Sequence, residues 1–204
     1  MVGPRTGVRR GADPHRAPRR RRLVANDVRG RGAALTFTLV AAGRTGPNRA
    51  LSFGDEGRSL DERGRRDVSS LDLRCPLAIC GPESSVRETA ALLADGVRVD
   101  DALRSIDLGS WVGRRPEEIP PAELHAWFTD PHAAPHGGES VAAFLGRVRT
   151  RLGDLPPAPE GVVVVAKPVV QAAVALHRDV GAAGFFGVDI PPASTWTVDI
   201  SIRG

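Results

Sequence analysis

The sequence has little of what a metal site or a disulfide framework requires. It contains two cysteines, Cys75 and Cys80, and five histidines, which show no ligand spacing such as His-x-x-x-His. Cys80 stands in an apolar run, where a free thiol acts as a small hydrophobic side chain. We therefore predict no bound metal and no cofactor. The two free thiols favour the reducing environment of the cytoplasm.

Long apolar segments are also missing. No stretch approaches the roughly 18 apolar residues that a helix needs to cross a membrane. An apolar run that follows a cluster of arginines is broken by Asn26, Asp27 and the arginines at 29 and 31. A secretion signal needs an unbroken apolar region after its basic start. The sequence therefore predicts neither a membrane span nor a secretion signal.

Positive charge is concentrated at the start of the chain. Residues 1–31 hold ten arginines and two aspartates, a net charge of +8, whereas the other residues hold 18 basic and 22 acidic groups, a net charge of −4. Residues 1–33 have almost no apolar periodicity, which predicts a basic disordered tail. The run Arg19–Arg22 suits nucleic acid or an anionic membrane. No aromatic residue or nucleic-acid motif accompanies it, which favours a solvated extension.

The segment 34–204 is long enough to bury one hydrophobic core. We therefore predict that it forms a single α/β domain. Val162–Val165 is a continuous apolar run, typical of a strand buried on both faces. Apolar spacing predicts strands at 35–40, 77–80, 97–99, 161–166 and 195–202, and helices at 59–71, 84–93, 122–128, 140–152 and 169–180. Strands that alternate with helices predict a three-layer sandwich with a mostly parallel central sheet and helices on both faces.

Local signals refine some of these elements. The pattern Ser59-x-x-Glu62 is a capping box, which predicts the start of the first helix. Residues 156–160 are rich in proline and predict a linker turn. In the last strand, apolar and polar residues alternate from Trp196 to Ile202. This pattern suits a strand with one face more exposed to water.

The turn after the first strand carries the strongest functional signal. It reads Ala41-Ala42-Gly43-Arg44-Thr45-Gly46-Pro47-Asn48 and follows a buried strand, where catalytic loops of α/β proteins often lie. This turn resembles the Arg-His-Gly-x-Thr-x-x-Asn loop of the histidine phosphatase (phosphoglycerate mutase-like) superfamily. Gly43, Thr45 and Asn48 match that pattern. Ala41 and Ala42 stand where the family has Arg and His.

Further segments resemble the family's motifs and follow them in the family's order. The segment 103–113 is similar to Leu-Arg-Glu-Ile-Asp-Phe-Gly-x-Trp-Glu-Gly, and 137–148 is similar to Gly-Gly-Glu-Ser-x-x-x-Phe-x-x-Arg-Val. The other similar segments are 60–64, 82–90, 163–170 and 192–194. The resemblance covers about residues 35–204 and implies the phosphoglycerate mutase-like fold.

The resemblance also implies a set of catalytic positions. In the family, one His attacks the phosphoryl group, a second His and two Arg surround the phosphate, and a carboxylic acid protonates the leaving oxygen. Here Ala42 is at the nucleophile position, Ala41 and Ser85 at the Arg positions, Ser105 at the acid position and Lys167 at the second His position. Loss of one such group typically costs a factor of about 100 to 10,000. The sequence therefore predicts that the phosphohistidine chemistry is lost.

The remaining polar residues of these segments have two interpretations. Lys167, the only lysine of the chain, and Arg44 are expected to form an anion-binding pocket with Thr45 and Asn48, or else to be surface charges on loops. A desolvated Lys167 is also a candidate Schiff-base nucleophile, which the sequence favours least.

Five other residues of these motifs have structural interpretations. For His136 a place on a loop surface is favoured over the pocket rim. Trp111 and Trp127 are predicted to lie in the core or the pocket wall. Asp107 and Glu139 are expected to cap or salt-bridge loops rather than act as a carboxylate pair.

Three functions follow from these observations. The leading one is a cytoplasmic pseudophosphatase, a member of the fold that binds an anionic small molecule or a partner without phosphoryl transfer. The alternative is an enzyme of the same fold that acts on a phosphorylated or other anionic small molecule through a non-standard site around Lys167. The third, a nucleic-acid or membrane binder that uses the basic tail, is the least favoured.

Overall fold

A five-stranded sheet forms the centre of the computed structural model, which describes residues 34–46, 52–54, 57–155 and 161–201. Its strands are β1 (Ala34–Ala41), β2 (Cys75–Cys80), β3 (Ala94–Val99), β4 (Val162–Val165) and β5 (Thr195–Ser201). The strand order is β3-β2-β4-β1-β5, and every pairing is parallel except that of β1 with β5. The predicted strands are therefore present, and β1 lies inside the sheet.

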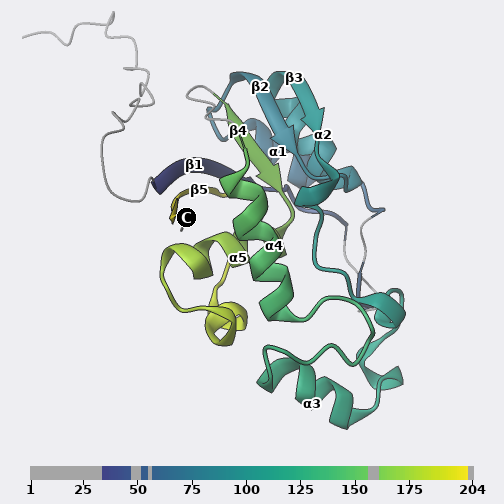
Figure 1. The fold of residues 1–204 in the computed structure, drawn as a ribbon. Coiled ribbons are helices and arrows are strands. Elements are labelled where there is room, and N and C mark those ends of the chain that lie inside the picture. The colour runs from purple at the N-terminus through teal and green to yellow at the C-terminus, as the bar shows by residue number, and fades with distance from the viewer. Residues whose placement is uncertain (1–33, 47–51, 55–56, 156–160, 202–204) are drawn as a thin grey trace, which may run out of the picture.

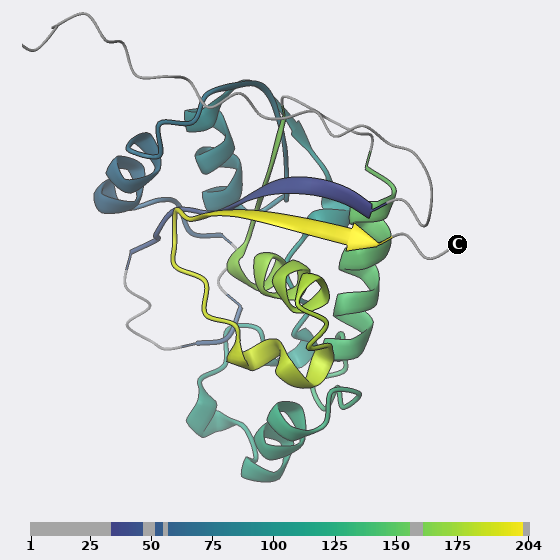
Figure 2. The same ribbon diagram turned by 90° about the vertical axis from the view of Figure 1, so that its left-hand side faces the viewer.

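Helices cover both faces of this sheet (Figure 1). The helices α1 (Glu62–Ser69) and α2 (Ser84–Leu93) pack on one face, and α4 (Val141–Gly153) and α5 (Lys167–His177) pack on the other. The short helix α3 (Pro121–Thr129) lies away from the sheet in both views, whereas β1 and β5 run side by side (Figure 2). The predicted three-layer α/β sandwich is confirmed.

The valines of β4 show why the sheet holds its two helical layers. All four side chains are buried. Val163 and Val165 belong to the apolar cluster under α4 and α5, and Val162 and Val164 belong to the cluster under α1 and α2. Successive side chains of a strand point to opposite faces, so a continuous valine run fills both layers at once.

Two helix boundaries differ from the prediction. The capping box at Ser59 is wrong, because Asp61 caps α1 and its carboxylate accepts the N–H of Gly64 at 2.6 Å. Residue Leu60 instead forms a β-bridge with Thr45, which holds the chain extended before the helix.

Helix α5 begins at Lys167 and ends at His177, earlier at both ends than predicted. Pro168 fits the first turn, where its missing N–H would have no partner in any case. Asp179 has a positive φ of 55°, a left-handed conformation that cannot continue the helix.

Several predictions concern parts of the chain that are not described. Residues 1–33, the predicted linker at 156–160, Asn48 and Ile202 lie outside the described residues. Among the helices of the described ranges, none has both the length and the apolar character needed to cross a membrane.

Candidate ligand site at the carboxyl edge of the sheet

Positions that match the family's catalytic residues meet where the parallel strands end. Ala41 is in register with Val165 of β4, and the N–H of Ala42 donates to the Val165 carbonyl at 2.9 Å. Lys167 follows directly as the first residue of α5. The N–H of Gly81, just after β2, also donates to β4. The ends of β1, β4 and β2 therefore form one edge from which these positions project.

The side chains at the end of β1 have no catalytic capacity. Ala41 is 1% exposed and lies in the core, and Ala42 is half-buried. A methyl group has neither a lone pair for nucleophilic attack nor a donor for a phosphoryl oxygen. The end of β1 thus presents two methyl groups at this edge of the sheet.

Hydrogen bonds anchor the turn after β1 to α2. The N–H of Gly43 donates to Thr89 Oγ1 at 3.0 Å, and this hydroxyl donates to the Ser85 carbonyl at 2.7 Å. A Cβ at Gly43 would lie 2.7 Å from Val68, so only glycine allows this close approach. The turn is therefore fixed beside the N-terminal turn of α2, which contains Ser85, the residue predicted to stand at the second Arg position.

A buried carboxylate supports the segment that contains Ser105. The Oε1 atom of Glu83 accepts the N–H of Ser105 at 2.5 Å, and Glu83 is 6% exposed. A Cβ at Gly81 would lie 2.6 Å from the other carboxylate oxygen, so the glycine makes room for it. Sequence reasoning missed Glu83, because a glutamate after a proline gives no sign that tertiary contacts will bury it.

Arg147 of α4 holds the same segment from the other side. Its guanidinium donates to the carbonyls of Ala102, Arg104 and Ser105 at 2.8, 3.1 and 3.0 Å. It also forms two hydrogen bonds with Glu139, of 2.6 and 2.8 Å. All of these bonds fix backbone atoms or the partner carboxylate, so Arg147 is a structural residue.

Glu139 is likewise occupied by loop contacts, as predicted. One of its carboxylate oxygens accepts the N–H of Asp107 at 3.1 Å, and its own N–H donates to the Asp107 carbonyl at 2.8 Å. Burial pushes the pKa of Glu139 upward, but the hydrogen bonds from Arg147 outweigh this and hold the pKa below its usual value. The Asp107 carboxylate accepts the N–H of Gly109 at 2.9 Å, which is a capping contact.

The residues predicted to bind an anion are paired with acids. Arg44 Nε lies 3.1 Å from Asp61 Oδ2. Lys167 Nζ lies 3.4 Å from Asp189 Oδ1, and its side chain is 53% exposed. The hydrogen bond from the Gly64 amide, opposed by desolvation and helped by Arg44, lowers the pKa of Asp61. An anion-binding set of Arg44, Thr45, Asn48 and Lys167 stays a prediction, and Asn48 is outside the described residues.

His136 is buried, not on the surface as predicted. It is 2% exposed, and its ring lies 4.9 Å from Trp111 and 4.5 Å from Trp127, centroid to centroid. Its Nδ1 atom accepts the N–H of Gly138 at 3.0 Å, and its carbonyl accepts the N–H of Ser110 at 2.9 Å. Burial lowers the pKa of His136, and Asp107 partly offsets this. Both tryptophans are buried, as predicted.

Ser105 lines an open cavity of about 450 Å³. Its lining residues are Gly54, Gly57, Arg104, Ser105, Asp107, Leu108 and Val112. Among the predicted site residues that the structure describes, Ser105 lines the cavity, whereas Arg44 and Lys167 do not. In the described part of the chain, no group of three or more His, Cys, Asp or Glu residues could hold a metal ion.

The chain belongs to the histidine phosphatase superfamily (branch 1), whose family model matches residues 37–203. No curated protein is similar enough in sequence to match. Its fold is that of phosphoglycerate mutase-like proteins. A phosphoglycerate mutase from Thermus thermophilus is 25% identical, with a TM-score of 0.64 over 83% of this chain and 100% of that one.

Two further solved structures show the same fold. A mycobacterial glucosyl-3-phosphoglycerate phosphatase is 24% identical, with a TM-score of 0.67 over 82% of this chain and 91% of that one. A candidate α-ribazole-5′-P phosphatase from Escherichia coli is 21% identical, with a TM-score of 0.69 over 83% of this chain and 92% of that one. At these identities the likeness concerns the fold and not the activity.

Proposed function

We propose that this chain has lost the phosphoryl transfer of its superfamily and works by binding a small ligand or a partner. The observation that carries the proposal is the pair of methyl groups at Ala41 and Ala42, at the strand end where the family has its Arg and its nucleophilic His. Ser85, Ser105 and Lys167 occupy the other three catalytic positions, and none restores the missing groups. A hydroxyl is a weak acid, and an ammonium ion lacks the lone pair of imidazole.

The framework around these positions supports a binding role. The hydrogen bonds of Gly43, Glu83 and Arg147 hold the surrounding segments at fixed positions. Groups held in this way lose little freedom when a ligand binds, which favours binding. A cavity of the size that small ligands occupy lies beside them.

An enzyme centred on Lys167 has less support. A Schiff-base or general-base lysine must be desolvated so that it loses its proton near neutral pH. The Lys167 side chain is 53% exposed and pairs with Asp189, so it is not desolvated. Borohydride trapping of a carbonyl compound on Lys167 would favour an enzyme centred on Lys167 over the binding role.

The proposal is tested with the purified full chain and two substrates, p-nitrophenyl phosphate and a sugar phosphate. We expect no hydrolysis above that of a heat-treated sample, in the wild type and in Lys167→Ala alike. Arg98→Gln, a charge change on the exposed strand β3, serves as the matched control. Hydrolysis by the wild type that Lys167→Ala abolishes and Arg98→Gln retains would overturn the proposal.

A restored variant makes the negative result informative. Ala41→Arg, Ala42→His, Ser85→Arg, Ser105→Glu and Lys167→His together return all five family side chains. We expect this variant to hydrolyse p-nitrophenyl phosphate, because only side chains have to be supplied to the framework. Activity in the restored variant and none in the wild type would show that the replacements at these five positions account for the loss of phosphoryl transfer.

A further inference from the structure

Strand β3 is an open edge of the sheet (Figure 1). In the described part of the chain it pairs with β2 alone. The N–H of Asp100, the next residue after β3, donates to the Cys80 carbonyl of β2 at 2.8 Å. Backbone groups of alternate strand residues point to the same side. The N–H and C=O groups of Asp95, Val97 and Val99 therefore point away from β2.

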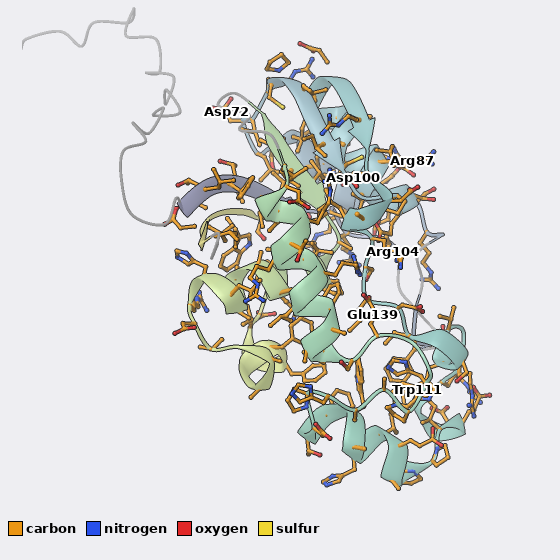
Figure 3. All side chains as sticks on the ribbon, in the orientation of Figure 1. Asp72, Arg87, Asp100, Arg104, Trp111 and Glu139 are labelled. Carbon is orange, nitrogen blue, oxygen red and sulfur yellow. The ribbon has the colours of Figure 1, made fainter. Side chains whose placement is uncertain are left out.

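The other edge of the sheet is formed by β5 and is partly covered. The N–H of Asp199 donates to His177 Nδ1 of α5 at 3.1 Å. The outward-pointing backbone groups of β3 have no such hydrogen bond with a described residue. This edge is also remote from the loops around Trp111, because Asp100 and Trp111 lie toward opposite ends of the molecule (Figure 3). An uncovered edge of this kind is a template for a further strand.

Strand β3 lacks most of the devices with which proteins block an edge. Residues 94–99 contain no proline and no lysine. Their register with β2 is constant, so the strand has no bulge. The Asp95 carboxylate is paired with Arg74 of the preceding loop, at 3.0 Å. Arg98 is the remaining charged side chain of the strand, and it decides which pairings of this edge are allowed.

A second copy of the chain fits this edge in one antiparallel register. Only a two-fold axis at Val97 pairs all three outward-pointing residues, because Val97 then faces Val97 of the second copy and Asp95 faces Val99. In that register Arg98 faces Gly96, which has no side chain to obstruct it. An axis at Arg98 would set two guanidinium groups against each other, which destabilises a strand pair.

The side chains on one face of the edge are also self-complementary. Val97 and Val99 lie on the same face of the sheet, because successive side chains alternate. Both are exposed in a single copy. In the register with the axis at Val97, the two valines of one copy and the two of the other form one apolar strip. Cross-strand pairs of β-branched residues stabilise antiparallel pairing.

We propose that two copies of this chain associate through antiparallel pairing of their β3 strands, with the two-fold axis at Val97. The two sheets then form one continuous sheet, and the pairing is closed because each copy uses its only uncovered described edge. This inference goes beyond the proposed function and does not depend on it, since self-association and loss of phosphoryl transfer are measured separately.

The first test is sedimentation of the full chain at about 50 µM. Val97→Lys removes one valine of the strip and sets two ammonium groups opposite each other at the axis. Val180→Lys is the matched control, because Val180 is 45% exposed and Val97 40% exposed, and Val180 follows α5 on the other side of the sheet. Thermal melts check that each variant is folded.

We expect the wild type and Val180→Lys to sediment as dimers. Val97→Lys should raise the Kd of the dimer by at least about tenfold, because like charges directly opposite each other destabilise strand pairing. The wild-type dimer should persist at about 0.5 M NaCl, since hydrogen bonds between backbone groups are not screened as exposed charges are.

A second test examines the register. In an antiparallel pair, residues that exchange hydrogen bonds have their α-carbons about 5.5 Å apart, within reach of a disulfide. Val97→Cys should therefore give a disulfide-linked dimer on mild oxidation. Val99→Cys should not, because four residues of strand, about 14 Å, separate Val99 from its copy. The native cysteines are buried and should not interfere.

Three results would overturn the inference. The first is a monomer at about 100 µM for a wild-type chain with a native melting curve. The second is a dimer that Val97→Lys leaves unchanged, or that is cross-linked by Val99→Cys and not by Val97→Cys. The third is a dimer that dissociates at about 0.5 M NaCl, which would assign the association to exposed charges such as the arginines of residues 1–33.

Discussion

Arg147 and Glu139 form a bidentate ion pair behind the cavity, with both side chains less than one-fifth exposed. The pair connects α4 to the segment 102–107, because Arg147 also binds three carbonyls and Glu139 binds a backbone N–H. The pair therefore positions three of the residues that line the cavity, Arg104, Ser105 and Asp107.

Replacing Arg147 by methionine should destabilise the fold by about 2–4 kcal/mol, because it removes the cation paired with Glu139 and the donor to three carbonyls. The measurement is urea denaturation at neutral pH. Arg74→Met is the matched control, since the Arg74–Asp95 pair is exposed and worth less than about 1 kcal/mol. Equal decreases in the free energy of unfolding in the two variants would show that the buried pair stabilises the fold no more than the exposed pair does.

Protonation of His136 should destabilise the fold below neutral pH. Burial lowers the pKa of this histidine in the folded state below its ordinary value of 6.5, so the unfolded chain binds the proton first. Its contribution to stability is complete above pH 6.5 and is lost as the pH falls through the folded-state pKa. Unfolding free energies between pH 7.5 and 5 should therefore fall less steeply in His136→Gln than in the wild type. Parallel curves would contradict this.

Close packing of α1 against the turn after β1 should make Gly64 intolerant of alanine. A Cβ at Gly64 would overlap the carbonyl oxygen of Arg44. We expect Gly64→Ala to lower the free energy of unfolding by about 2 kcal/mol or more, despite the better helix propensity of alanine. Gly146→Ala in α4 is the control, because its Cβ would meet nothing within 4 Å and should add about 0.5–1 kcal/mol. Thermal melts of both variants give the comparison.

The two cysteines should be inert in the native chain. Burial raises the pKa of Cys80 to about 11 and also raises the pKa of Cys75. At pH 8 the thiolate fraction of Cys80 is then roughly 100-fold below that of an ordinary thiol with a pKa of 9.0. A thiol reagent such as DTNB should label both cysteines only after urea is added. Rapid labelling of the folded chain would show that the local structure opens.

The parts of this structure that the sequence predicts well are those set by local pattern. The valine run of β4 and the apolar spacing of α2 have one plausible structure each, and both are found where expected. Burial of single polar residues depends instead on contacts distant in sequence. Glu83 is buried because the chain at Ser105 returns to it, and His136 because two tryptophans enclose it.

The same distinction applies to the candidate site. The positions of Ala41, Ala42 and Lys167 at one sheet edge followed from the motif order, since parallel strands end together. The sequence does not show which basic side chains lack an acidic partner, because an arginine and its acid partner are adjacent only in the folded chain. The sequence singled out Arg44 and Lys167, and the structure pairs each with an aspartate and leaves Arg104 without an ionic partner in its described part.

The strand order has a consequence for how the protein is made. Both neighbours of β1, the first strand to be synthesised, come from the far end of the chain: β4 on one side and β5 on the other. Thr36 is paired with Asp199, 163 residues later in the sequence, so β1 gains this neighbour only after that residue has been synthesised. Until then the apolar strand has no partner and is open to aggregation. The pairings on both sides of β1 are thus non-local, which makes them late events in folding.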